Sequence, residues 1–179
     1  MRNRLIVLLG ILLVVIATSL LWYTGKIEKY NSRAFGMAFY YSDKYFLEEK
    51  VVSDTEKIII LTEDTEENRL VREGVSPGRE GPTAITLRVI KLSNSSTTPL
   101  EWARSNVESN FNLSIGEYHE GKVGQKDSVY YMTDGLYVAD NIVVVAKGRA
   151  IHISVTYLTP EDKIRKDLAR IIGSIYFYE

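Results

Sequence analysis

Four short segments typical of strands, the first of them polar, lie between Gly116 and Leu158 and restrict the fold more than any other feature of the sequence. Turn signals separate them at Gly124, at Asp134-Gly135 and at Lys147-Gly148. Alternation is the period of a half-buried strand, and turns at this spacing are typical of antiparallel neighbours. The faces of the last segment are Ile151, Ile153, Val155 and Tyr157 on one side and His152, Ser154 and Thr156 on the other. The pattern predicts an antiparallel meander.

Five further segments have the composition of strands: residues 36–41, 45–52, 57–62, 83–92 and 174–178. The segment 57–62 has four aliphatic residues in succession, which indicates a strand buried on both faces. The polar stretch 63–82 contains three glycines and two prolines, and this composition is typical of a loop.

A first amphipathic helix is predicted after residue 97. Thr98 is the expected N-cap, Pro99 occupies the first helical position, and Glu101 completes a capping box. Its apolar residues at helical spacing are Leu100, Ala103, Val107 and Phe111, with Trp102 beside them. We expect this face to lie on the sheet.

A second amphipathic helix is predicted to begin at Thr159-Pro160, with Asp162 in its first turn, and to end at Gly173. Its apolar side consists of Ile164, Leu168, Ile171 and Ile172. The elements together predict an α+β fold: a mainly antiparallel sheet of six to eight strands flanked by two amphipathic helices.

The segment Leu5–Tyr23 is apolar, small or aromatic throughout, and thirteen of its nineteen residues are Leu, Ile or Val. As a helix it would be about 28 Å long, close to the roughly 30 Å of a bilayer core. Trp22 and Tyr23 have the position of an interfacial aromatic belt. The segment therefore predicts a transmembrane signal anchor. The alternative is a signal peptide cleaved near Ser19, which would release a secreted soluble domain.

The anchor sets the expected organisation of the chain. Residues 1–4 form a cytoplasmic n-region, 5–23 the transmembrane helix, 24–34 a linker, and 35–179 the globular domain. The basic residues on the two sides of the anchor are nearly balanced. A short N-terminal tail before a single apolar segment is the usual signal-anchor arrangement, so we expect a single-pass protein of the cell membrane with its domain on the extracytoplasmic side.

Charge and cysteine content exclude several classes of protein. Residues 1–33 have a net charge of +4 and residues 34–179 a net charge of −5. An acidic domain is a poor match for nucleic acid, which is bound through Lys and Arg. The chain has no cysteine, which excludes a disulfide scaffold, a thiol nucleophile and a lipid-modified N-terminal Cys.

The sequence contains no motif of a known catalytic or cofactor site, and we predict no catalytic, metal or cofactor-binding residues. His152 and Ser154 point to the same side of their predicted strand, but no orienting carboxylate can be placed beside them. We expect His152 to be packed or hydrogen-bonded beneath a helix. His119 and Glu120 are expected on a solvated strand or turn.

Two further clusters have a structural and a functional interpretation. The carboxylates Glu63, Asp64, Glu66 and Glu67 lack the sharp Gly turn of a calcium loop and are expected to be a solvated loop tip. Seven tyrosines fall on predicted strands: Tyr40, Tyr41, Tyr45, Tyr130, Tyr131, Tyr137 and Tyr157. Half-buried sheet positions explain them, and a concave face or sheet edge that binds a peptide, a glycan or a partner subunit is the alternative.

The order of these elements, together with the C-terminal motif "IIGSIYF", resembles the PsbP-like family. The resemblance covers residues 35–179 and implies an antiparallel sheet between helices. The chain departs from the frequent Tyr-Pro and Trp of the family's first strands, because Ser42 follows Tyr41 and Tyr45-Phe46 replaces the Trp. Photosystem members look like extrinsic, non-catalytic subunits of a membrane complex, so the resemblance carries over no catalytic residues.

We therefore expect a membrane-anchored, extracytoplasmic binding or complex-assembly module with a protein partner and without catalytic activity. The alternative from another class is a hydrolase of the cell envelope. A pocket joining His152 to a nucleophile and a carboxylate would favour the enzyme.

Overall fold

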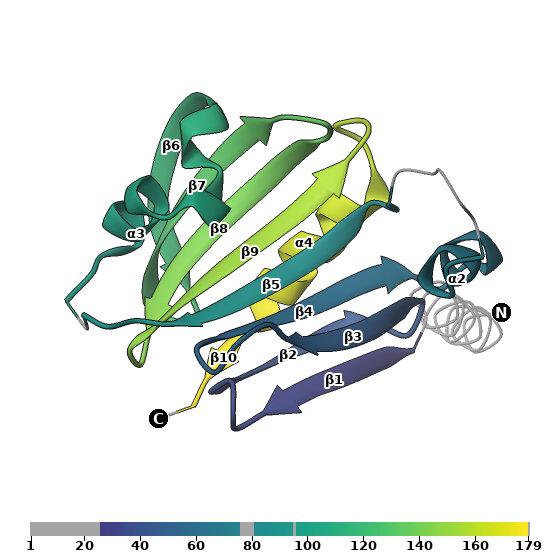
Figure 1. Ribbon diagram of the computed structural model, residues 1–179, viewed down its shortest axis with the longest axis horizontal. Coiled ribbons are helices and arrows are strands. Elements are labelled where there is room, and N and C mark those ends of the chain that lie inside the picture. The colour runs from purple at the N-terminus through teal and green to yellow at the C-terminus, as the bar shows by residue number, and fades with distance from the viewer. Residues whose placement is uncertain (1–25, 76–80, 95, 179) are drawn as a thin grey trace, which may run out of the picture.

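The computed structural model describes residues 26–75, 81–94 and 96–178. In these residues ten strands form two antiparallel sheets, accompanied by three α-helices and two 3-10 turns (Figure 1). In chain order the elements are β1 (Ile27–Ser32), β2 (Met37–Ser42), β3 (Tyr45–Val51), β4 (Glu56–Glu63), α2 (Glu66–Arg72), β5 (Ala84–Lys91), α3 (Pro99–Ser105), η1 (Val107–Ser109), η2 (Phe111–Leu113), β6 (Ser114–Val123), β7 (Lys126–Asp134), β8 (Val138–Ala146), β9 (Arg149–Tyr157), α4 (Lys163–Ser174) and β10 (Tyr176–Phe177). The predicted α+β class is confirmed.

The larger sheet has seven strands in the order β3-β4-β5-β9-β8-β7-β6. The four strands predicted as a meander are β6 to β9, each paired antiparallel with its neighbour in sequence. The β8–β9 register places Ile142 opposite Ile153 and Val143 opposite His152. The alternation of β9 is as predicted: Ile151, Ile153, Val155 and Tyr157 belong to one core cluster, whereas His152 faces the other side of the sheet.

The second sheet has three strands in the order β1-β2-β10 and was not expected as a separate sheet. Residues 24–34 were predicted to be a linker, but β1 pairs with β2 from Ile27 to Ser32, so the globular fold begins earlier. Tyr30 explains the difference because its ring is buried and stacks on Phe39 at 4.8 Å. A single buried aromatic among charged neighbours gives a weak strand signal.

Helix α4 and the small sheet cover one face of the large sheet (Figure 1). The apolar residues predicted for α4 face this core, with Ile164, Leu168 and Ile171 buried. The buried carboxylate of Asp167 ties the helix to the β2–β3 turn: it accepts a hydrogen bond from Tyr45 Oη at 2.8 Å and lies 2.6 Å from Lys44 Nζ. The helix includes Gly173 and ends one residue later than predicted.

Helix α3 packs on the opposite face, over β7 and β8. Its capping box is formed as predicted: Glu101 N donates to Thr98 Oγ1, and Thr98 N donates to Glu101 Oε2. The helix is shorter than its apolar spacing indicated, because it ends at Ser105 and two 3-10 turns follow. Val107 is consequently 81% exposed, whereas Trp102, expected only beside the apolar face, is buried.

Two local predictions are corrected. The stretch 63–82 was expected to be a loop, but Thr65 caps the short helix α2 by accepting a hydrogen bond from Asn68 N at 3.2 Å. The strand 57–62 was expected to be buried on both faces. In β4 only one face is fully covered, since Ile59 and Leu61 are buried while Ile58 and Ile60 are half-buried.

The predicted n-region and transmembrane helix, residues 1–4 and 5–23, lie outside the described residues. Within the described ranges no helix has both the length and the apolar character that a bilayer crossing requires.

Candidate functional site

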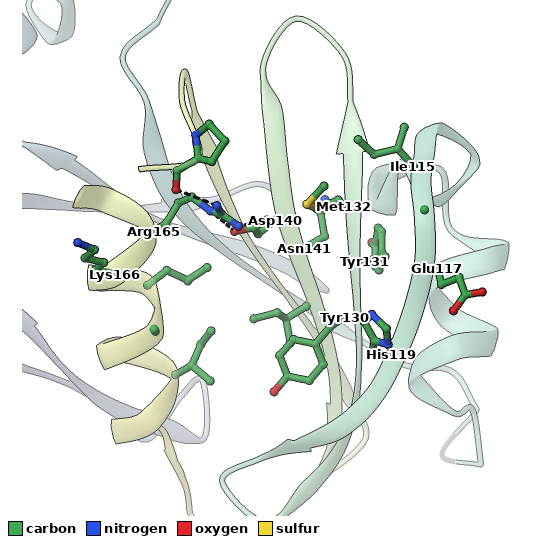
Figure 2. Close-up of a pocket in the computed structure, with 16 residues that line it drawn as sticks. Ile115, Glu117, His119, Tyr130, Tyr131, Met132, Asp140, Asn141, Arg165 and Lys166 are labelled. Carbon is green, nitrogen blue, oxygen red and sulfur yellow. Dashed lines mark hydrogen bonds and ion pairs between the residues drawn. The ribbon is translucent and has the colours of Figure 1, made fainter. Parts of the chain in front are cut away.

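A groove of about 720 Å³ lies between α4 and β6 on the face of the large sheet that α4 covers (Figure 2). Its floor is formed by Tyr130, Met132 and Ile142 from β7 and β8. The α4 wall consists of Leu168, Ala169 and Ile172, and the opposite wall is Ile115, Gly116, Glu117 and His119 from β6. The groove exists because α4 crosses only part of the sheet and leaves this half of β7 and β8 uncovered.

Strand β6 gives the groove a free sheet edge. It is the outermost strand of the large sheet, and its pairing with β7 is irregular between Ile115 and His119. Ile115 and Met132 are 40% and 37% exposed, so apolar side chains accompany the free backbone groups of the edge. An exposed edge strand beside an apolar surface is a template for pairing with another chain.

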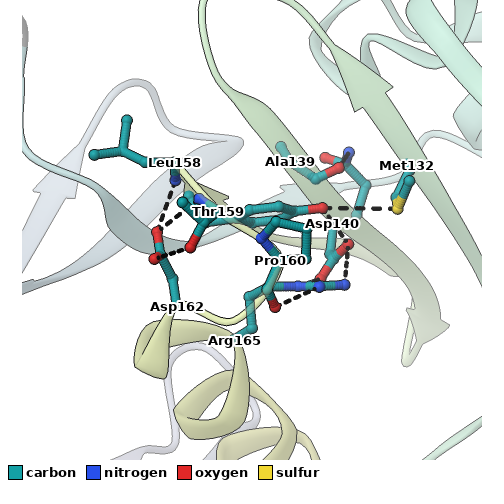
Figure 3. Close-up of polar contacts among 10 residues, drawn as sticks. Met132, Ala139, Asp140, Leu158, Thr159, Pro160, Asp162 and Arg165 are labelled. Atoms are coloured by element: carbon teal, nitrogen blue, oxygen red, sulfur yellow. Dashed lines mark hydrogen bonds and ion pairs between the residues drawn. The ribbon is translucent and has the colours of Figure 1, made fainter.

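The end of the groove near the β9–α4 connection is closed by an ion pair (Figures 2 and 3). Arg165 of α4 binds Asp140 of β8 through two nitrogens, Nε to Oδ2 at 2.7 Å and Nη2 to Oδ1 at 3.1 Å. Tyr157 Oη donates to the same carboxylate at 3.1 Å, and its ring lies 4.4 Å from the guanidinium carbon. Hydrogen bonding to Asp140 raises the pKa of Arg165, and burial raises the pKa of Tyr157.

The chain around this ion pair is fixed by a local cap (Figure 3). Asp162 accepts hydrogen bonds from the backbone N–H groups of Leu158 and Thr159 at 2.8 and 3.1 Å. The hydroxyl of Thr159 hydrogen-bonds the same carboxylate and contributes most to lowering the pKa of Asp162. The two backbone bonds lower the pKa further. Arg165 also donates to the carbonyl oxygen of Pro160 at 2.9 Å. Arg165 therefore donates hydrogen bonds to Asp140 and to Pro160. We call the ion pair between Arg165 and Asp140 the clamp between α4 and β8.

The two histidines lie on different surfaces. His119 faces the groove from β6, with Glu117 two residues before it. His152 lies on the opposite face of the large sheet and is only 6% exposed, with its ring 5.9 Å from that of Trp102 in α3. The prediction of a packed, hydrogen-bonded histidine beneath a helix is confirmed for His152.

The contacts of His152 form a closed polar network. Asn141 donates its amide N–H groups to Thr133 Oγ1 and to the Ala139 carbonyl, so its oxygen accepts from His152 Nε2 at 3.0 Å. Tyr131 Oη donates to the Ser109 carbonyl at 2.8 Å. Burial, and then the charge of Arg88, lower the pKa of His152 to about 4. A neutral imidazole held by an amide is suited to packing rather than to base catalysis.

The acidic cluster has basic neighbours of its own. Asp64 lies 2.7 Å from Arg72, Glu66 lies 3.2 Å from Arg69, and Glu63 lies 3.5 Å from Lys44. Glu67 belongs to the same exposed part of α2. Across the described ranges, no group of three or more His, Cys, Asp or Glu side chains is arranged to hold a metal ion.

The seven tyrosines predicted on strands divide between structural and exposed positions, and Tyr137 lies in the β7–β8 turn rather than on a strand. Tyr131 and Tyr157 are buried in the two core clusters, and only Tyr130 has its ring on the floor of the groove. Tyr40, Tyr41 and Tyr45 border a second apolar groove of about 510 Å³ beside Ile27. Tyr137 reaches the Gly81 carbonyl at 3.2 Å. Tyr130, on the inner strand β7, is the one of the seven tyrosines whose position on the groove floor fits the alternative of a sheet face that binds a partner.

Residue patterns did not identify the groove. Arg165 and Asp140 are 25 positions apart, and neither belongs to a motif. Met132 sits in a strand whose other exposed positions are polar. The available signal was the lack of apolar alternation in 117–123, which marks an edge strand exposed on both sides.

Solved structures identify the fold. No family model matches the chain, and no curated protein matches it. The solution structure of cyanobacterial PsbP from Synechocystis sp. PCC 6803 aligns with a TM-score of 0.58 at 10% identity, covering 86% of this chain and 94% of that one. A crystal structure from Bacteroides thetaiotaomicron VPI-5482 aligns with a TM-score of 0.50 at 14% identity, covering 87% of this chain and 49% of that one. The chain has a PsbP-like fold.

Proposed function

We propose that this protein is a membrane-anchored binding or assembly module without catalytic activity, and that the groove between α4 and β6 holds an extended segment of a partner protein. The observation that carries the proposal is the combination of an apolar groove of about 720 Å³ with an unpaired sheet edge along one wall. The PsbP-like fold, which the chain shares with cyanobacterial PsbP, supports a binding or assembly role.

The chemistry of the groove favours a peptide. An added strand would pair with the free edge of β6, which points away from β7, and would place every second side chain on the groove side of the sheet beside Ile115 and His119. The charged groups at the closed end already neutralise each other, so the groove offers shape and apolar contact rather than a reactive centre. Such a surface suits recognition.

The contacts of His152 argue against the alternative of a hydrolase. Its side-chain partners among the described residues are Asn141 and Tyr131, neither of which is a carboxylate. The imidazole also lies on the opposite face of the sheet from the groove. A catalytic histidine would need a substrate, a nucleophile and an orienting carboxylate on the same surface.

The proposed location follows from the sequence of residues 5–23. We place this segment in the bilayer as a single-pass anchor, with the domain on the extracytoplasmic side. Ile27, the first residue of β1, follows the end of the anchor by four positions, so the small sheet would lie next to the membrane surface. The partner would then be a membrane protein or a protein of the same compartment.

Site-specific crosslinking in intact cells tests the groove. The chain has no cysteine, so Met132→Cys and Val51→Cys each introduce one attachment point for a benzophenone maleimide. Both positions are exposed, but Val51 lies on the opposite edge strand. We expect a discrete protein adduct from Met132→Cys and none from Val51→Cys. Equal adducts at the two positions, or no adduct from either, would contradict the proposed groove.

A blocking variant tests whether the partner occupies the groove. Ile115→Glu places a charge on the apolar wall, where the exposed side chain is not needed for the core. We expect it to abolish the Met132→Cys adduct while thermal unfolding stays within a few degrees of the parent protein. An undiminished adduct would show that the partner binds elsewhere.

A further inference from the structure

A cleft at the end of the large sheet farthest from Ile27 gathers four cationic side chains. It has a volume of about 430 Å³ and lies between the β1–β2 turn, the start of β4, the end of β5 and the β8–β9 turn. Its charged lining residues are Lys57, Lys91, Lys147, Arg149 and one carboxylate, Asp54. The lining therefore carries a net charge of about +3 at neutral pH.

The strand register brings these cations together. In the β5–β9 pair Lys91 is opposite Arg149, and in the β4–β5 pair Lys57 is opposite Val89. Because side chains alternate, Lys57, Lys91 and Arg149 point to the same face at one end of three adjacent strands. Lys147 and Gly148, both with positive φ, form the two-residue turn that carries the fourth cation to the rim.

Within the part of the chain that the structure describes, these cations have no carboxylate partner. Among the described residues none of the four lies within 4.0 Å of a carboxylate oxygen, whereas Lys44, Arg88 and Arg165 each form ion pairs. The contacts of the cluster are with neutral groups: Lys57 Nζ lies 5.1 Å from the ring of Phe35, and Arg149 Nη2 donates to the Ala34 carbonyl at 3.4 Å.

This concentration of positive charge is unexpected in an acidic domain. Residues 34–179 carry five more acidic than basic residues, so a random surface patch would be neutral or negative. Like charges on adjacent strands repel one another and lower stability unless an anion offsets them. A guanidinium and several ammonium groups around one cleft match the oxygens of phosphate groups.

We infer that the cleft at Lys57, Lys91, Lys147 and Arg149 binds a multivalent anion that carries phosphate groups. The cleft is separated from Ile27 by the length of β1, about 20 Å for six residues. The ligand is therefore soluble, or belongs to a headgroup that reaches this end of the domain. The inference is independent of the α4–β6 groove.

Calorimetric titration of the full chain in nanodiscs of neutral lipid with pyrophosphate tests the site. We compare Lys91→Gln/Lys147→Gln with the matched control Lys122→Gln/Lys163→Gln, which also removes two exposed lysines. The cleft variant is expected to weaken binding at least tenfold and the control less than twofold. Binding should also weaken when NaCl is raised from 50 to 300 mM, as expected for ion pairing in water.

Three outcomes would overturn the inference: no binding of pyrophosphate at 50 mM NaCl, an equal loss in both variants, or binding of citrate as tight as that of pyrophosphate. The conservative variant Lys91→Arg/Lys147→Arg should restore affinity to within a few-fold. Nanodiscs that contain phosphatidylglycerol show whether the bound phosphate group belongs to a lipid or to a soluble compound. Loss of pyrophosphate binding in them assigns the site to a lipid headgroup, and unchanged binding assigns it to a soluble phosphate compound.

Discussion

His152 makes the stability of the domain depend on pH. Its pKa is about 4 in the folded protein, against about 6.5 for an unperturbed imidazole, because the buried ring is desolvated. The unfolded chain therefore takes up a proton before the folded one as pH falls. The stabilisation by neutral His152 is fully present above pH 6.5, and we expect about 3 kcal/mol of it to be lost between pH 7 and pH 4.

The variant His152→Gln isolates this contribution from the carboxylates that titrate in the same range. Urea unfolding is followed by the fluorescence of Trp102, which packs against the imidazole. The wild-type free energy of unfolding should fall relative to that of the variant by about 3 kcal/mol from pH 7 to pH 4. A relative change below 1 kcal/mol would mean that the folded imidazole accepts a proton at an ordinary pH.

At the scale of elements, the clamp between α4 and β8 should contribute more to stability than an exposed pair of the same length. Arg165–Asp140 and Lys122–Asp127 both have an N–O distance of 2.7 Å. Their side-chain exposures are 30% and 23% in the first pair and 64% and 80% in the second. We expect Asp140→Asn to cost about 1–3 kcal/mol and Asp127→Asn to leave the free energy of unfolding nearly unchanged.

Thermal and urea unfolding of the two variants measure the difference. Asp140→Asn should also widen the groove, because Arg165 loses the charged partner that holds it to β8. The Met132→Cys adduct should then decrease in Asp140→Asn and stay unchanged in Asp127→Asn. Equal destabilisation of both variants would show that the clamp contributes no more than a surface ion pair.

The elements that the sequence predicted correctly are those whose signal is local. The β6–β9 meander depends on turns of two or three residues and on the alternation of its last strand, and the start of α3 depends on Thr98 and Glu101. The errors arose where a single side-chain contact outside the periodic pattern decides the structure. β1 is a strand because Tyr30 stacks on Phe39, and α3 stops at Ser105 because Ser109 folds back to donate to the Ala103 carbonyl. Neither contact leaves a periodic pattern.

At the scale of the whole molecule, the candidate sites lie between elements that are distant in sequence. The groove needs α4 beside β6, and the cationic cleft needs β4, β5 and the β8–β9 turn at one sheet end. Strand order determines both, and local periodicity does not encode strand order. The fold itself could be predicted from the element order and the C-terminal motif, even though the similar solved structures share only 10% and 14% of their residues with this chain.

The proposed orientation in the membrane predicts which residues a reagent outside the cell can reach. The flanking charges, Arg2 and Arg4 against Lys26, Lys29 and Arg33, nearly balance, so the orientation has to be measured. In intact cells a membrane-impermeant maleimide should label Leu136→Cys, which is 76% exposed at the β7–β8 turn. The same reagent should label Asn3→Cys only after permeabilisation, because residues 1–4 are proposed to be cytoplasmic. The opposite pattern would place the domain inside the cell, and loss of the Asn3→Cys site from the mature chain would show cleavage near Ser19.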